Sequence, residues 1–521
     1  MKSYCIAIIG AGQAALPIIE KAKQMSVRVL AFARQDSYAK EMVDIFIEEN
    51  SFDVDFMAEK CREFGVDGVM ATSELTTEVA ARLAHRLRLP GNDIENGFAG
   101  KNKYIMRTRV SALQSVHQPA FELYHPERVY NYPVVIKPTD ACGKRGVCIA
   151  YDESELLPLI EVAAANSTNG DVLIEEYLAG GKEYSVECLS FAGNHQVIQY
   201  TEKESSGPPH FVEIAHHQPA DLSDEMRQRI DVAVDDILSV LGLNCGMAHL
   251  ELKIIDNRVF FIEVGARGGG DHISDVLTIK STGFDYYKAA IECALGTYIK
   301  TEPHTIACTG IYFHCQQNKY LNKLFVDAKE ADWCISNTVK DDFFHEVNTN
   351  IEASEAGYII YCSDHRIRLK DSAHLFMAQI INRLPNAKLM LRQHCSIIGN
   401  ILSEEQFEAW YAKIERTGNL IAIIDNQMIV AFSLLYCNHR DTLDAYLCNV
   451  YVLNDYRGIG LTYRLLEKAV EICENNGFNS ISLDVDKDNE IAIRVYEKFG
   501  FCQCYSVKRQ TGKIAMMYNL N

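Results

Sequence analysis

The sequence has no CxxC pair, no low-complexity linker, no internal repeat and no apolar run long enough to cross a membrane. Of its 17 cysteines only Cys502 and Cys504 form a close pair, and the others are scattered among apolar residues, which predicts reduced thiols rather than disulfides or zinc sites. The apolar run at residues 6–9 is too short for a secretory signal, and glycines follow it directly. We therefore expect a cytoplasmic protein without a membrane segment.

Positive charge is also in short supply. Lys and Arg total 51 and Asp and Glu total 70, which gives a formal net charge of −19. A net negative field repels phosphate backbones and anionic lipids, so neither nucleic acid nor a membrane is an expected partner. The chain has 521 residues, 48% of them hydrophobic and 23% charged, which is typical of a soluble globular protein. This length predicts about three or four folding units.

The N-terminal region, residues 4–90, alternates between strand-like and helix-like segments. Apolar runs at residues 6–9, 27–33 and 66–71 are short enough for buried strands, and residues 16–25 are amphipathic. Strands that alternate with helices in this way predict a parallel sheet.

A glycine turn at residues 10–12 follows the first of these strands. Such a turn also occurs in nicotinamide-binding folds, but here Ala15 stands at the third glycine position. No acid ends the second strand before Asp36. An oxidoreductase is therefore an alternative with little support from the sequence.

The segment after residue 130 has features suited to holding phosphates. An apolar strand at residues 132–138 ends in Lys137-Pro138, which directs one ammonium group toward a cleft. The loop at residues 140–147 contains glycines, whose backbone N–H groups can converge on phosphate, and the basic residues Lys144 and Arg145.

Acidic residues follow at the end of the next strand. The apolar run at residues 172–178 contains Glu175, and Glu183 lies just beyond two glycines. This order suits a strand edge that contacts adenine, followed by a carboxylate that binds ribose.

Two carboxylates are predicted to meet across a hairpin. Glu251 lies on one alternating strand and Glu263 on the next, with a turn at residues 256–257 between them. Two carboxylates side by side repel each other unless a cation lies between them, which predicts a Mg²⁺ site. Arg267 and the glycines at 268–270 follow, and they offer a planar cation and exposed N–H groups to a phosphoryl group or a substrate carboxylate.

These features together resemble the ATP-grasp superfamily, and within it the L-amino-acid ligase-like branch, over roughly residues 1–370. Members join a carboxylate to an amine through an acyl phosphate and release ADP. The stretches that carry the resemblance are Lys137-Pro138 with its Gly-Lys-Arg-Gly-Val loop, Glu202-Lys203 with Phe211-Val212-Glu213, His249-x-Glu251, and Glu263-x-x-Ala266-Arg267-Gly268-Gly269.

The resemblance implies a role for each matching residue. The implied assignments are Lys103 and Lys137 on the ATP phosphates, Lys144, Arg145 and Gly146 in the covering loop, Glu175 and Leu178 beside adenine, Glu183 on ribose, Glu251 and Glu263 on Mg²⁺, and Arg267 on the acyl phosphate and the tetrahedral intermediate.

Two positions depart from the pattern of this branch. The second metal-binding strand usually reads Glu-x-Asn, whereas here Gly265 follows Glu263 and Val264, so one oxygen ligand is missing. Lys144 stands where a serine is usual, and its charge and bulk are expected to affect the substrate rather than ATP.

The C-terminal region forms a separate α/β pattern. A hairpin at residues 419–432 precedes a strand at 445–453, which turns at 457–462 into an amphipathic helix that ends at Gly477. Small residues at a strand-to-helix turn leave N–H groups free at a helix N-terminus, which predicts an anion site suited to a pyrophosphate.

This region resembles the GNAT N-acetyltransferase family over about residues 388–521. The turn matches the family's Arg/Gln-x-x-Gly-x-Gly/Ala motif except that Thr462 replaces the final small residue. The match implies that Arg457, Gly458, Gly460 and Asn489 bind acetyl-CoA and that Tyr496 protonates the leaving thiolate. The family's general base varies in position and is not assigned.

The expected fold is therefore α/β and α+β multidomain. It comprises a Rossmann-like pre-ATP-grasp domain at residues 1–95, an ATP-grasp domain with two subdomains at 96–372, and a GNAT fold at 388–521. A helix at residues 373–384, broken by Pro385, is expected between the last two.

The expected function is a bifunctional enzyme that uses ATP, Mg²⁺ and acetyl-CoA. One site joins an amino acid to an amine or a second amino acid, and the other acetylates an amine. The alternative is that the GNAT domain binds acetyl-CoA only to regulate the ligase. A biotin-dependent carboxylase would share the fold, but no Met-Lys-Met motif is present. A homodimer is the default expectation.

Overall fold

The computed structural model divides into two compact units. The first comprises Met1–Lys319 and Ala328–Arg366, and the second comprises Tyr320–Asp327 and Ile367–Asn521. The residues it describes are 3–95, 98–207, 211–340, 344–368, 376–382, 384, 387–397, 402–425, 428–439, 441–457, 460–504 and 512–520. Within these ranges no helix is both long and apolar enough to span a membrane.

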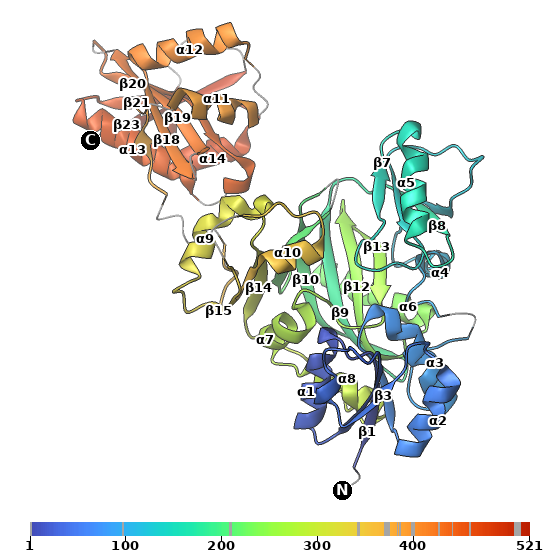
Figure 1. Cartoon of the computed structure of the whole chain (residues 1–521). Helices are drawn as coiled ribbons and strands as arrows, with labels where there is room; N and C mark the ends of the chain where they lie inside the picture. Colours follow the sequence, from blue (N-terminus) through green and yellow to red (C-terminus); the bar gives the residue numbers. More distant parts are fainter. Residues whose placement is uncertain are drawn as a thin grey trace. The chain divides into compact units, whose positions relative to one another are not determined.

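The first unit begins with the four-stranded parallel sheet that the sequence predicts, in the order β3-β2-β1-β4. Side chains of β1 alternate between its two faces. Ile6 and Ile8 pack with α1 and α8, whereas Cys5, Ala7 and Ile9 pack with α2 and α3 (Figure 1). The elements are β1 (Cys5–Ile9), α1 (Leu16–Gln24), β2 (Arg28–Ala33), β3 (Ile45–Glu48), α2 (Val54–Phe64), β4 (Gly68–Ala71), α3 (Thr77–Leu87) and, from much later in the chain, α8 (Tyr286–Ala294).

An eight-stranded antiparallel sheet forms the centre of this unit, in the order β13-β12-β9-β10-β11-β14-β16-β15. Helix α6 packs its apolar stripe, which includes Ile230, Val234, Ile237 and Leu241, against this sheet together with α4. The elements are α4 (Lys103–Val110), β9 (Lys182–Phe191), β10 (Asn194–Ser205), β11 (Glu213–Gln218), α6 (Asp224–Leu241), β12 (Cys245–Ile255), β13 (Arg258–Gly265), α7 (Thr278–Thr282), β14 (Cys308–Phe313), β15 (Cys334–Asn337), α10 (Asn350–Ala356) and β16 (Tyr358–Ser363).

A smaller antiparallel sheet, in the order β5-β8-β6-β7, carries the predicted adenine and phosphate residues. Helix α5 covers its apolar face, where Ile136, Ile160 and Ile174 meet. The elements are β5 (Phe121–Leu123), β6 (Val134–Pro138), β7 (Cys148–Ala150), α5 (Glu153–Ala165) and β8 (Val172–Glu176).

The second unit contains a seven-stranded sheet in the order β17-β18-β19-β20-β21-β23-β22. Helices α11 and α12 share an apolar core with β18 and β19, and α13 packs against β18 to β21. The elements are α9 (Asn322–Asp327), β17 (Gln379–Ile380), α11 (Ala387–Ile397), α12 (Glu404–Thr417), β18 (Asn419–Asp425), β19 (Met428–His439), β20 (Asp444–Val452), α13 (Leu461–Asn475), β21 (Ser480–Asp486), α14 (Glu490–Phe499), β22 (Cys502–Gln503) and β23 (Lys513–Asn519).

The helix expected at residues 373–384 is wrong over its described part. Residues 379–380 instead form β17, which pairs with Ile421 and Ala422 of β18. The backbone N–H of Ile381 donates to Leu420, so the hydrogen bonds that a helix would form internally are made to a neighbouring strand. Pro385 lies outside the described residues.

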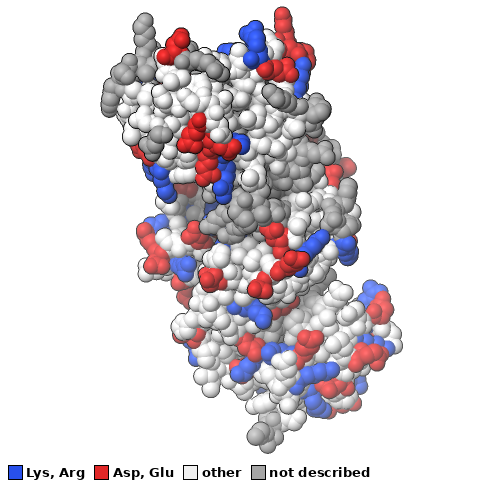
Figure 2. All heavy atoms as spheres, turned by 90° about the vertical axis from the view of Figure 1, so that its left-hand side faces the viewer, with Lys and Arg blue, Asp and Glu red and all other residues white. Residues whose placement is uncertain are grey.

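Acidic and basic side chains are mixed on the face of the molecule that Figure 2 shows. Figure 2 shows one face of the molecule, where Lys and Arg lie interspersed with Asp and Glu among the described residues. That face therefore carries no continuous patch of one charge.

Candidate functional site

Two adjoining cavities lie in the first unit. The smaller one, of about 330 Å³, is bordered by the small sheet and by strands β9, β12 and β13. The larger one, of about 610 Å³, is bordered by β4, α3, α8 and the loop that follows β13. Both cavities are lined by Glu74, Gly143, Arg267, Gly270 and Asp271, so they meet at Arg267.

Most of the predicted ATP-site residues are brought together around the smaller cavity. Two residues of the predicted loop, Arg145 and Gly146, do not line it. The guanidinium of Arg145 donates back to the carbonyl of Cys142, and an added Cβ at Gly146 would lie 2.9 Å from both Pro138 and Asn166. The residues that do line it are Lys103, Lys137, Lys144, Glu175, Leu178, Glu183, Glu251, Glu263 and Arg267.

The ammonium of Lys103 is buried beside one of the paired carboxylates. Asn102 caps helix α4 and so fixes where Lys103 enters the cavity. The Nζ of Lys103 donates to the carbonyl of Ala141 at 2.7 Å and lies 3.4 Å from Glu263. Burial lowers the pKa of Lys103, but Glu263 and Glu74 raise it more, so the ammonium stays charged.

Lys137 is held by a buried carboxylate. Its Nζ lies 2.7 Å from Glu175, whose other oxygen accepts from Arg107 at 2.6 Å. Burial raises the pKa of Glu175, but Arg107 and Lys137 lower it to about 2. The carboxylate of Glu175 is therefore ionised and lies between Lys137 and Arg107. The assignment of Glu175 to adenine stays a prediction.

Lys253 contacts both Leu178 and Glu183, which line the smaller cavity. Its Nζ donates to the carbonyl of Leu178 at 2.8 Å and lies 3.9 Å from Glu183. One ammonium group therefore ties the predicted adenine edge to the predicted ribose carboxylate.

The predicted carboxylate pair is confirmed in its register. Strands β12 and β13 pair antiparallel with Glu251 directly opposite Glu263, and the turn at Asp256 and Asn257 has φ of +48° and +60°. Asn and Asp are among the residues that tolerate this left-handed backbone, which suits a two-residue hairpin turn. Glu251 and Glu263 therefore project from neighbouring strands into the same cavity.

Lys203 balances one member of this pair, although the sequence assigned it no role. Its Nζ lies 2.6 Å from Glu251 and 2.8 Å from Glu213. Burial raises the pKa of Glu251, but Lys203 and His249 hold it well below the usual value. Glu251 is therefore ionised and is held in place by these two cations.

A second cluster of possible metal ligands lies close to the Glu251–Glu263 pair. Ligand atoms of Glu213, His216 and Asp271 lie within 4.8 Å of one another, an arrangement able to hold a metal ion. Glu213 already pairs with Lys203 and, at 2.9 Å, with Lys144.

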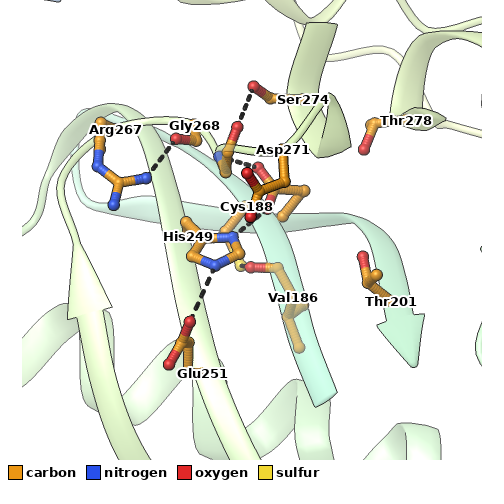
Figure 3. Close-up of polar contacts among 12 residues, drawn as sticks. Val186, Cys188, Thr201, His249, Glu251, Arg267, Gly268, Asp271, Ser274 and Thr278 are labelled. Carbon is orange, nitrogen blue, oxygen red and sulfur yellow. Dashed lines mark hydrogen bonds and ion pairs between the residues drawn. The ribbon is translucent and has the colours of Figure 1, made fainter. Parts of the chain in front are cut away.

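A series of buried polar contacts, called the relay below, connects Glu251 to the glycine loop after β13. His249 lies between Glu251, 3.5 Å from its Nε2, and Glu187, which accepts from its Nδ1. Glu187 also accepts from the backbone N–H of Gly269 at 3.0 Å. Figure 3 shows His249 between Glu251 and this loop, with Ser274 bonded to the loop from the other side.

The same relay explains why residue 269 is glycine. An added Cβ at Gly269 would lie 2.7 Å from atoms of both Glu187 and His249. Burial lowers the pKa of His249, but Glu187 raises it to about 9, so the imidazole is a charged donor between two carboxylates. The backbone of the loop can approach this ion pair only where no side chain intervenes.

Arg267 is anchored from the opposite side. Its guanidinium donates to Glu74 at 2.8 Å and to the carbonyl of Gly268 at 2.8 Å. Glu74 follows β4 of the N-terminal sheet, where Ser73 caps a short helix. Glu74, which lies 193 positions earlier in the chain, therefore orients the guanidinium of Arg267. No local sequence motif predicted this contact.

In the second unit, the predicted turn lies at the start of α13. Gly460 has φ +84° at the N-cap, and Arg457 donates to the carbonyl of Val452 at 3.1 Å with its guanidinium over Tyr451. The backbone N–H groups of the first turn of α13 follow directly. Gly458 lies outside the described residues.

The predicted residues of α14 lie at its two ends. Asn489 caps the helix by accepting from the N–H of Ala492. Tyr496 is buried near its C-terminal end against Phe501, and burial raises its pKa to about 12. A neutral phenol of this kind can donate a proton to a thiolate.

Strands β20 and β21 diverge next to this turn. Their parallel pairing runs from Asp444 opposite Ser480 to Tyr446 opposite Ser482, and both strands continue beyond that point. Among the described residues the ladder between the two strands ends at Tyr446, whose hydroxyl donates to Asp484 of β21 at 3.2 Å.

The relay generates a stability prediction. Gly269→Ala is expected to lower the free energy of unfolding of the first unit by about 1–3 kcal/mol, because the new methyl group must displace Glu187 or His249. Gly270→Ala is the matched control, since nothing lies within 4 Å of its added Cβ. Urea unfolding followed by circular dichroism measures both, and equal stability of the two variants would contradict this account of the relay.

Two protein families match this chain, one in each unit. The sequence model of the ATP-grasp domain matches residues 130–275, and that of the acetyltransferase (GNAT) family matches residues 390–501. Dapdiamide A synthase from Enterobacter agglomerans is 27% identical over 237 residues, which are 42% of this chain and 55% of that protein. The arginine-specific large chain of carbamoyl phosphate synthase from Arabidopsis thaliana is 27% identical over 39% of this chain, but only 17% of its own length is covered.

Solved structures show the same fold. The L-amino acid ligase from Bacillus licheniformis superposes with a TM-score of 0.56 at 22% identity, over 81% of this chain and 99% of that one. Phosphoribosylglycinamide synthetase from Anaerococcus prevotii gives a TM-score of 0.54 at 18% identity, over 72% and 98% of the two chains. Residues 130–275 therefore carry an ATP-grasp domain and residues 390–501 a GNAT acetyltransferase domain, and both are families of enzymes.

Proposed function

We propose that the chain is a bifunctional enzyme with an ATP-dependent carboxylate–amine ligase and an acetyl-CoA-dependent N-acetyltransferase. The observation that carries the ligase is the meeting of two buried lysines, the Glu251–Glu263 pair and Arg267 around one cavity. We keep the domain boundaries 1–95, 96–372 and 388–521 as part of the proposal. The relatives' names, an amino acid ligase and a dapdiamide synthase, support an amino acid as substrate.

In the ligase, the substrate carboxylate attacks the γ-phosphorus of ATP, and the bond to the β–γ bridging oxygen breaks to release ADP. An amine then attacks the carbonyl carbon of the acyl phosphate, phosphate leaves, and the amine loses a proton to form the amide. Lys103 and Lys137 neutralise the phosphates, and Arg267 stabilises charge on the acyl phosphate and on the tetrahedral intermediate.

The carboxylate pair fits one Mg²⁺ ion. Glu251 and Glu263 would hold it, and the ion would neutralise charge on the phosphates. We propose no second ion at this pair, because Lys203 already occupies one face of Glu251 and Gly265 offers no side-chain oxygen. The side chain of Arg267 lies against Gly265, with Cγ 3.4 Å from the position of an added Cβ.

In the acetyltransferase, an amine attacks the acetyl carbonyl carbon, the thiolate of CoA leaves, and the amine nitrogen loses a proton to solvent as the amide forms. The N-terminus of α13 with Gly460 suits the pyrophosphate of CoA. The part of β20 beyond Tyr446, where its pairing with β21 ends, suits the pantetheine arm of the cofactor. Tyr496 donates the proton that the thiolate takes up. The amine of the ligase substrate or product is the proposed acceptor, because both sites then act on one set of amino compounds.

A product screen tests the two activities together. Incubation of the purified chain with ATP, Mg²⁺, acetyl-CoA and the 20 amino acids is expected to give ADP and an acetylated condensation product, seen by mass spectrometry. Glu263→Ala removes half of the carboxylate pair and is expected to lower ADP formation at least about 100-fold. Glu225→Ala, at an exposed position on α6, is the matched control.

Each outcome of the screen is informative. No ADP from wild type with any amino acid would contradict the ligase. Ligation that responds to acetyl-CoA without release of free thiol would contradict the acetyltransferase and make the second unit a regulatory module.

Metal stoichiometry tests the single-ion proposal. Titration of Mn²⁺ into the chain with a non-hydrolysable ATP analogue, followed by electron paramagnetic resonance, is expected to show one tightly bound ion per chain. Glu263→Ala is expected to weaken that binding at least about tenfold, because a charged ligand is lost. Two bound ions of similar affinity in wild type would contradict the role given to Lys203 and Gly265.

A further inference from the structure

The charged side chains of the larger cavity come from two segments of the chain. Among the described residues that line it, every Asp, Glu, Arg and His comes from the loop after β4 or from the segment after β13. These residues are Glu74, Arg267, Asp271, His272 and Asp275. Of these, Glu74, Arg267 and Asp271 also line the smaller cavity, beside the place proposed for the acyl phosphate.

The opposite walls are built from alanine side chains. Helix α3 contributes Ala80, Ala81 and Ala84, and helix α8 contributes Ala290 and Ala294. Their exposed fractions lie between 1% and 7%. Ala80, Ala84 and Ala290 also belong to the apolar cores on the two faces of β1, so these methyl groups are shielded from bulk water. Val69, Met70 and Met247 extend the same apolar surface from strands β4 and β12.

Close backbone approaches seal the far end of this space. An added Cβ at Gly68 would lie 2.7 Å from the carbonyl oxygen of Ala294, and one at Gly91 would lie 2.8 Å from Ala84. Strand β4 and helix α8 therefore touch directly beyond the cavity. Short side chains along α3 and α8 leave the space open next to these contacts, and its volume suits a ligand of amino-acid size or larger.

We propose that one amino acid substrate of the ligase carries a bulky apolar side chain, such as that of leucine, methionine or phenylalanine. Its side chain lies along the α3–α8 alanine wall, and its reacting group lies beside Arg267. Each methylene buried on this wall is worth about fourfold in binding, whereas a charged side chain there would find no opposite charge and only the hydroxyls of Thr77 and Tyr287 on the two helices. This inference rests on the proposed ligase function and names the substrate class of that site.

The test compares amino acids by their rates of ADP release. With ATP and Mg²⁺, wild type is expected to use leucine, methionine or phenylalanine with kcat/KM at least about 10-fold above alanine and about 100-fold above aspartate or lysine. Ala80→Leu and Ala290→Leu fill the space from opposite walls. Each is expected to lower kcat/KM for the bulky substrates at least about 10-fold while alanine changes less than about threefold.

Lys288→Leu, an exposed change on α8, is the control and is expected to leave both rates unchanged. Thermal unfolding of each variant reports whether it folds, and the second wall variant serves if the first does not. Preference of wild type for small or charged amino acids would overturn this inference while leaving the ligase in place.

Binding separates the two proposals further. Leucine is expected to raise the unfolding temperature of wild type, and Ala80→Leu is expected to remove that shift. ADP release from no amino acid, together with the leucine shift, would overturn the ligase and leave the apolar subsite standing. Absence of both would overturn the substrate class as well.

Discussion

Two carboxylates held face to face are the constraint on which the rest of the ligase site depends. The pairing of β12 and β13 forces Glu251 and Glu263 into one cavity, and at close range their repulsion must be offset. Lys203 and His249 offset it at Glu251, and Lys103 does so at Glu263. Each of these cations then needs its own anchor, so the pair sets the arrangement of the surrounding side chains.

The anchors carry this constraint across the first unit. His249 donates to Glu187, and Glu187 also accepts from the backbone N–H of Gly269. These contacts position the loop that contains Arg267. Arg267 is held from the other side by Glu74 of the N-terminal segment. The β12–β13 hairpin, the glycine loop and the parallel sheet are thereby joined through charge-assisted hydrogen bonds, which are stronger than neutral ones.

The sequence predicted the elements whose signals are local. The parallel N-terminal sheet and the register of Glu251 with Glu263 followed from apolar periodicity and from the length of one turn. The partners Glu74, Glu187 and Lys203 were not predicted, because they come from distant strands and their charges are common at surfaces. The helix expected at 373–384 was wrong because its apolar residues also suit a strand, and pairing with β18 decided between the two.

The most direct test of the ligase chemistry follows an oxygen atom. An amino acid labelled with ¹⁸O in its carboxylate is supplied with ATP, Mg²⁺ and an amine, and the phosphate released is examined by mass spectrometry. The acyl-phosphate route predicts that each phosphate carries one ¹⁸O atom taken from the carboxylate. Label that appears in AMP, or phosphate without label while the amide forms, would contradict it.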